Sequence, residues 1–269
     1  MTAQMEDRKS GDSRTGVYVY GILPGDIEIE PGTAGVGDPP GEVRAIRYRD
    51  LTALVSDVDL DRPLGRAEDL FAHEELLDAS AAEMPVLPLR FGAVLASDDA
   101  VSDELLGPHY DEFTDALRQL DGHAEYVVKG RYVEQAVLGE LLAENPEAAE
   151  LGQQISGADP DATRDQRIQL GEIVSNAIEA RRQADTRALG DVVADQVTAS
   201  VVRPPSHELD AVYAAFLVET GKAAALRQAV EQLASEWGDR MDLRLIGPLA
   251  AYDFVGNAAP AEDAETETR

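Results

Sequence analysis

The densest set of potential ligand side chains is the acidic stretch Asp57-x-Asp59-x-Asp61, with Glu68 at the twelfth position counted from Asp57. Calcium loops place oxygen ligands at this spacing because they wrap around a hard cation. The sixth position is Arg62, however, where the sharp turn of such a loop needs glycine, and a predicted strand precedes the stretch in place of a helix. We therefore interpret it as a solvated acidic loop and predict no metal site.

Three glycines, Gly35, Gly37 and Gly41, have nearly the spacing of a dinucleotide-binding fingerprint. That fingerprint requires a strand, the pattern GxGxxG and then the N-terminus of a helix. Here the third glycine comes one residue late, two prolines crowd the segment, and no helical pattern follows. The sequence favours a turn-rich loop, and we predict no nucleotide or other cofactor.

No residue pattern typical of catalysis stands out elsewhere. The four histidines are far apart and never form HExxH, so we interpret them as surface or structural side chains; they are His73, His109, His123 and His207. The chain has no cysteine, no G-x-S-x-G sequence and no P-loop. We predict that the protein is not an enzyme and has no catalytic residue.

Two apolar segments remain as candidate protein-contact sites. PLRFG, residues 88–92, is either a structural crossover or the carrier of an exposed arginine anchor for a partner. LIGPLAAYDFV, residues 245–255, continues beyond the last predicted strand and either packs on the other domain or forms an exposed patch. The candidate contact residues are Arg90, Phe91, Tyr252 and Phe254.

Charge limits the classes of partner. The 269 residues include 52 Asp and Glu but only 23 Lys and Arg, a formal charge of -29, which would repel nucleic acid and anionic membranes. Lys9, Lys129 and Lys222 are the only lysines, and this acidic, lysine-poor composition is typical of proteins that work at molar salt. Because no secretory signal and no apolar run of about 18 residues occurs, we expect a soluble, cytoplasmic protein.

The first half of the chain is predicted to form both strands and helices. Strands are expected at 16–23 and, as a hairpin, at 43–48 and 51–55. Helices are expected at 66–83 and 100–120, the latter kinked or split at Pro108. The prolines of 85–95 predict an edge strand or crossover there.

From His123 the pattern starts again, with a strand, a short helix at 134–143, an acidic loop broken by Pro146 and Pro160, and a long amphipathic helix at 164–196. The remaining elements are strands at 198–202, 211–218 and 241–246 and a helix at 222–236. Strand, helix, two strands, helix and strand is the split βαβ order of a ferredoxin-like sheet. We predict an α+β protein of two domains with ferredoxin-like sheets. The expected parts are a disordered leader at 1–14, domains at 15–122 and 123–255, and a disordered acidic tail at 256–269.

Four stretches resemble, in order, those of the gas vesicle protein F/L family, with a haloarchaeal-type member of the L branch favoured by the acidic surplus and the length. They are YVYGI at 18–22, PVLPLRFGAV at 85–94, AEYVVK at 124–129 and LIGPLAAYDFV at 245–255. The family usually has a tryptophan and prolines after the closing Gly-Pro, where this chain has Leu249, Ala250 and Ala251, which places that contact in doubt.

The resemblance implies a non-enzymatic accessory or minor structural protein of gas vesicles, the shells that give cells buoyancy. Its expected partners are the hydrophobic shell protein and other gas vesicle proteins, and its expected role is in early assembly. It also implies a two-domain α+β fold with one modified ferredoxin-like domain. A ferredoxin-like regulatory module that binds a metal or a small molecule remains the alternative, because fold alone does not decide function.

Overall fold

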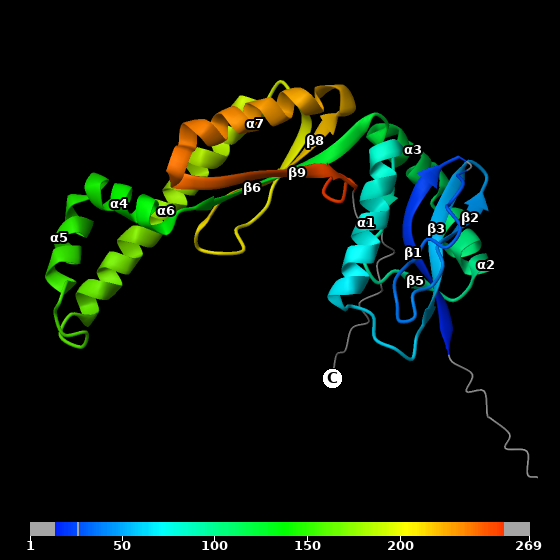
Figure 1. Cartoon of the computed structure of the whole chain (residues 1–269), viewed down its shortest axis with the longest axis horizontal. Coiled ribbons are helices and arrows are strands. Elements are labelled where there is room, and N and C mark those ends of the chain that lie inside the picture. The colour runs from blue at the N-terminus through cyan, green and yellow to red at the C-terminus, as the bar shows by residue number, and fades with distance from the viewer. Residues whose placement is uncertain (1–13, 26, 256–269) are drawn as a thin grey trace, which may run out of the picture. The chain divides into compact units, whose positions relative to one another are not determined.

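The chain folds into two compact units, each built around its own sheet (Figure 1). The computed structural model describes residues 14–25 and 27–255; the predicted acidic tail and all but the last residue of the predicted leader lie outside this range. The first unit comprises the described residues up to Gly122 together with those from Leu249, and the second is His123–Pro248. The prediction that 249–255 belongs to the second domain is therefore wrong.

The first sheet has five strands in the order β2-β3-β1-β4, with β5 also paired to β1. They are β1 (Thr15–Pro24), β2 (Arg44–Tyr48), β3 (Leu51–Asp59), β4 (Leu87–Pro88) and β5 (Val94–Leu95). The predicted hairpin is present, and the proline-rich segment supplies only two short strands beside β1. Proline cannot donate a hydrogen bond to a neighbouring strand, which explains why β4, with Pro85 before it and Pro88 at its end, is short.

The first unit has helices on either side of the proline-rich segment in sequence. They are α1 (Ala67–Glu83), α2 (Asp98–Ala100), the π-helix η1 (Val101–Leu106) and α3 (Tyr110–Leu120). The predicted split near Pro108 is confirmed, since α3 starts two residues later. Only some of the apolar residues predicted to face the core from α1 do so. Leu77 is buried, whereas Leu70 and Phe71 are 41% and 67% exposed.

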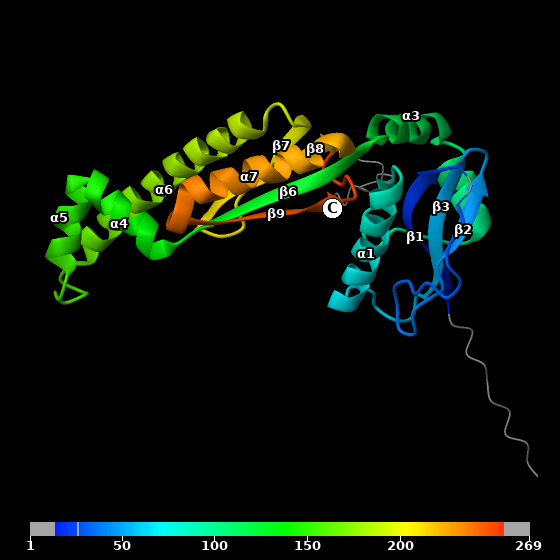
Figure 2. The ribbon, with the colours of Figure 1, turned by 45° about the horizontal axis from the view of Figure 1, so that its top comes forward.

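The second sheet has the order β7-β8-β6-β9 and the predicted ferredoxin-like connectivity. Its elements are β6 (His123–Tyr132), α6 (Arg164–Val193), β7 (Val197–Val202), β8 (Asp210–Glu219), α7 (Ala223–Trp237) and β9 (Met241–Leu249), with short 3-10 turns η2 (Thr220–Lys222) and η3 (Gly238–Arg240) around α7. Figure 2 shows α6 and α7 side by side over one face of this sheet. The first sheet repeats the strand order, but the described residues between β1 and β2, 25 and 27–43, contain no helix.

A helical pair, α4 (Glu134–Glu144) and α5 (Pro146–Ile155), packs on the N-terminal half of α6 (Figure 1). The prediction of a loop broken by Pro146 is wrong for 146–155. Proline at the first helical position loses no intrahelical hydrogen bond, and the Asn145 side chain caps the helix by accepting from the Ala148 amide at 3.1 Å. Of the described helices, none combines the length and the apolar character needed to cross a bilayer.

Candidate functional site

The two candidate contact segments meet in the first unit, around the buried side chain of His73 on α1. The ring of Phe91 lies 5.6 Å from that of His73 between centroids, and the ring of Tyr252 lies 6.4 Å away. Phe91 comes from the turn between β4 and β5, and Tyr252 from the closing segment. We name Tyr18, Tyr20, His73, Phe91 and Tyr252 the aromatic cluster.

Tyr18 of β1 connects the cluster through its hydroxyl group. That oxygen accepts a hydrogen bond from the Gly92 amide at 3.1 Å and lies 2.9 Å from Nδ1 of His73. The hydroxyl proton is thus available to His73, whose Nδ1 accepts it in the neutral form. Burial lowers the pKa of His73 to about 4, and a contact with the backbone of Leu89 opposes this less strongly. Burial also raises the pKa of Tyr18. The pair is therefore neutral at pH 7 and holds the turn that carries Phe91.

Tyr20 holds the glycine-rich loop to the same cluster. Its hydroxyl accepts from the Val36 amide at 2.8 Å and lies 2.8 Å from the hydroxyl of Ser56. A Cβ atom at Gly35 would overlap this hydroxyl, so the loop passes too close to Tyr20 for any larger residue. Gly35 is thus required for the packing of this loop. A close-packed glycine is compatible with the turn-rich loop predicted from the sequence.

Asp69, in the first turn of α1, is a structural carboxylate that the sequence did not single out. Its oxygens accept from the amides of Gly37 at 2.9 Å and of Gly65 and Arg66 at 3.0 Å each. Burial would raise the pKa of Asp69, but these three hydrogen bonds outweigh it and the pKa is lowered. The spacing Arg66 to Asp69 at a helix start could have indicated a cap, whereas the bond to Gly37 spans 32 residues and leaves no local pattern.

The closing segment packs on α1 through backbone and small side chains. Ala250 is fully buried, and its amide donates to Oδ1 of Asp78 at 2.8 Å. Burial raises the pKa of Asp78, opposed by this hydrogen bond. The described closing residues therefore pack on the first domain. This is one of the two interpretations that the sequence left open for this segment. Small residues at this point allow the close approach.

The four candidate residues differ in accessibility. Arg90 is exposed, while Phe91, Tyr252 and Phe254 are half-buried. Phe254 lies in a tight turn, in which its backbone amide donates a hydrogen bond to the carbonyl of Ala251 at 3.2 Å. Of these four candidates, Phe91 and Tyr252 are the two whose rings contact other rings of the aromatic cluster within the described residues.

The acidic stretch near β3 is committed to arginines. Asp57 pairs with Arg44 at 2.8 Å, and Asp61 with Arg14 at 3.4 Å. In the described part of the chain, no group of three or more His, Asp or Glu side chains is placed to hold a metal ion. The structure therefore offers nothing in favour of calcium binding there.

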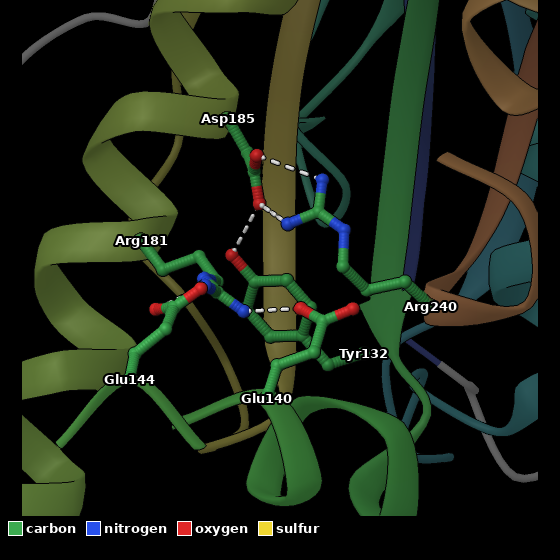
Figure 3. Close-up of polar contacts among 6 residues, drawn as sticks. All are labelled: Tyr132, Glu140, Glu144, Arg181, Asp185 and Arg240. Atoms are coloured by element: carbon green, nitrogen blue, oxygen red, sulfur yellow. Dashed lines mark hydrogen bonds and ion pairs between the residues drawn. The ribbon is translucent and has the colours of Figure 1, made fainter. Parts of the chain in front are cut away.

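A second polar centre lies in the second unit, between α6, β6 and η3 (Figure 3). Asp185 of α6 is buried and accepts from the Tyr132 hydroxyl at 2.7 Å and from both terminal nitrogens of Arg240 at 3.0 Å. One turn earlier, Arg181 pairs with Glu140 and Glu144 of α4. Burial and the neighbouring carboxylate raise the pKa of Tyr132. This centre fixes the long helix to the sheet.

Comparison with known proteins gives one consistent family. The model of the family described as gas vesicle synthesis protein GvpL/GvpF matches residues 16–256. Gas vesicle protein F of Streptomyces sp. (strain CB03234) is 36% identical over 241 residues, covering 88% of this chain and 98% of that protein. Gas vesicle protein F of Haloferax mediterranei is 24% identical over 245 residues, covering 89% and 92%. The crystal structure of GvpF from Microcystis aeruginosa superposes with a TM-score of 0.71 at 23% identity, covering 89% and 98%, and shows the same fold.

Proposed function

Because the chain belongs to the gas vesicle protein GvpL/GvpF family, we propose that it is an accessory or minor structural protein of gas vesicles. In this role it binds the hydrophobic shell protein and other gas vesicle proteins and helps to nucleate or assemble the vesicle in the cytoplasm. The proposal includes that it is not an enzyme. The observation that carries it is the length of the match, which leaves almost none of the Streptomyces relative uncovered.

A physical argument supports an escort role. An apolar shell subunit tends to aggregate, and salt strengthens apolar association. A partner with a net charge of -29 that covers the apolar face keeps such a subunit soluble. Exposed apolar side chains for such a contact are present on α1, where Leu70 lies one turn before His73 of the aromatic cluster and Phe71 follows Leu70. Arg90, Phe91, Tyr252 and Phe254 remain the proposed contact or interface-shaping residues.

The test is a pull-down of the tagged full chain co-expressed with the shell protein of the same gene cluster, at 0.15 M and at molar salt. We expect recovery of the shell protein at both, and loss of most of it with Phe71→Ser or Arg90→Ala. Arg118→Ala, an exposed arginine on α3, is the matched control and should retain binding. Failure of the unaltered chain to recover any gas vesicle protein would refute the proposal.

The finer predictions, a haloarchaeal-type origin and the L branch, remain predictions. The relatives reported above carry the name protein F, and the bacterial one is more similar than the haloarchaeal one. The alternative of a regulatory module that binds metal or nucleotide is separable by calorimetry with calcium and with ATP, for which the escort proposal expects no heat of binding.

A further inference from the structure

The second unit has a groove between α6 and the hairpin formed by β7 and β8, which we name the α6 groove. One cavity of about 550 Å³ has walls from Arg182, Thr186 and Arg187 of α6 and from Val202 to Pro205 and Asp210 to Tyr213. A second cavity of about 1010 Å³ shares Glu179, Arg182 and Pro205 with the first and continues toward Gly171. Volumes of this size are those of pockets that hold ligand groups.

The groove lies on a face of α6 different from the one used to hold the helix in place. Figure 3 shows Arg181 and Asp185 turned toward α4 and Tyr132, whereas Arg182 and Thr186, next to them in sequence, line the groove. Arg182 is fixed there, because its Nε donates to the Asp210 carbonyl at 2.7 Å and its Nη2 to the Glu208 carbonyl at 2.8 Å. The walls are thus preformed.

The strand beside the groove, β7, is an edge strand. Within the described sheet it pairs only with β8, so its other side presents backbone donors and acceptors without strand partners. Val202, the last residue of β7, is 63% exposed at the mouth of the first cavity. An extended segment can add to such an edge and place alternate side chains into an adjacent pocket.

Charge at the groove identifies the kind of segment. Two of its acids are satisfied by neighbouring groups: Glu179 pairs with Arg182, and the Asp210 carboxylate accepts from the Ser206 amide at 2.8 Å and the His207 amide at 2.9 Å. A third acid, Glu208, is exposed and lines the second cavity only. Arg203 pairs with Glu125. Arg187 differs, because within the described residues its side chain makes one hydrogen bond, from Nε to the Gln183 carbonyl at 3.1 Å, and no ion pair. An exposed guanidinium at the rim of an apolar cavity suits a carboxylate.

We propose that the α6 groove binds an extended segment of a partner protein, added along β7, with an apolar side chain in the cavity and a carboxylate two residues away on Arg187. The spacing of two places both side chains on one face of the added strand. This site is separate from the aromatic cluster and does not depend on the escort role. The net negative charge of the chain opposes an acidic ligand, but at physiological salt the screening length is about 8 Å, so distant acids contribute little.

The probe is a fluorescein-labelled hexapeptide STLTDT, titrated with the full chain by fluorescence anisotropy at 0.15 M salt. Two control peptides are STLTKT, with the charge reversed, and STLDTT, with leucine and aspartate on opposite faces. We expect saturable binding of STLTDT and at least tenfold weaker binding of both controls. Arg187→Gln should weaken STLTDT binding about tenfold, which corresponds to about 1.4 kcal/mol, and leave STLTKT unchanged.

Val202→Glu should remove STLTDT binding, because it places a charge at the cavity mouth without altering the core. Arg227→Gln, an exposed arginine on α7 away from the groove, is the matched control and should bind as the unaltered chain does. Urea unfolding followed by Trp237 fluorescence confirms that each variant is folded. Absence of saturable STLTDT binding up to millimolar concentration, equal binding of STLTDT and STLTKT, or unchanged binding by Arg187→Gln or Val202→Glu would each overturn the proposal.

Discussion

Lowering the pH should destabilise the first unit through His73. The folded-state pKa of about 4 lies below the ordinary value of 6.5, so between these pH values the unfolded chain binds more protons than the folded one. Stability is fully present above pH 6.5 and is lost as the pH falls toward 4. The difference of two to three pH units corresponds to about 3 kcal/mol, with a slope of at most about 1.4 kcal/mol per pH unit.

The assay compares the unaltered chain with His73→Gln, which stays neutral, in urea between pH 7.5 and 4. Hydrogen exchange of amides in α1 and β1 reports the first unit, while Trp237, the only tryptophan, reports the second as an internal control. Carboxylates titrate in both proteins, so the quantity of interest is the difference between the two pH curves. His109→Gln, an exposed histidine paired with Glu112, should follow the unaltered chain. Parallel pH curves for the unaltered chain and His73→Gln would refute the reasoning.

Substitutions in three sets of contacts test the remaining arguments by urea unfolding. Gly35→Ala should cost roughly 1–3 kcal/mol because its Cβ overlaps the Tyr20 hydroxyl, whereas Gly139→Ala in α4, with open space around it, should stabilise by about 0.5–1 kcal/mol; equal effects would contradict the packing argument. Asp69→Ala should cost roughly 1–3 kcal/mol, since three backbone amides lose their acceptor, and Asp69→Asn, which keeps the shape and one acceptor oxygen, should cost less; similar losses would indicate that the charge alone matters. Asp185→Ala should cost about 3–5 kcal/mol by Trp237 fluorescence, and adding Arg240→Ala should cost little more; additive losses would argue against a coupled pair.

Local patterns predicted most of the fold. Alternating Val and Tyr in 16–23 became β1, and the repeated strand and helix order after His123 became a sheet in the order β7-β8-β6-β9. The helix at 146–155 was predicted as a loop because Pro146 was interpreted as a helix breaker. Asn145 before it indicates instead a cap and the start of a helix. Periodicity gives no hint of the π-helix at 101–106, because such turns are rare and occur as short interruptions within α-helical sequence.

The candidate site depended on contacts that sequence does not record. Phe91 and Tyr252 were singled out separately, but their common neighbour His73 is distant from both along the chain. The hydrogen bond from Tyr18 to His73 spans 55 residues. Only the fold brings these side chains together, so composition and spacing could propose the residues and not their grouping.

Fifty-two acids could not be sorted by sequence, and the structure sorts them by burial. Four of the described acids are buried and satisfied by donors: Asp69 by backbone amides, Glu125 by Arg203, Asp185 by Tyr132 and Arg240, and Asp210 by Ser206 and His207. A surface pair such as Arg118 and Asp115, with both side chains about 70% exposed, contributes at most about 1 kcal/mol and is screened by salt. Stability should therefore depend on the four buried acids, which salt screens little. The exposed majority remains available for repelling other acidic surfaces, which is the property that an escort of an apolar subunit requires.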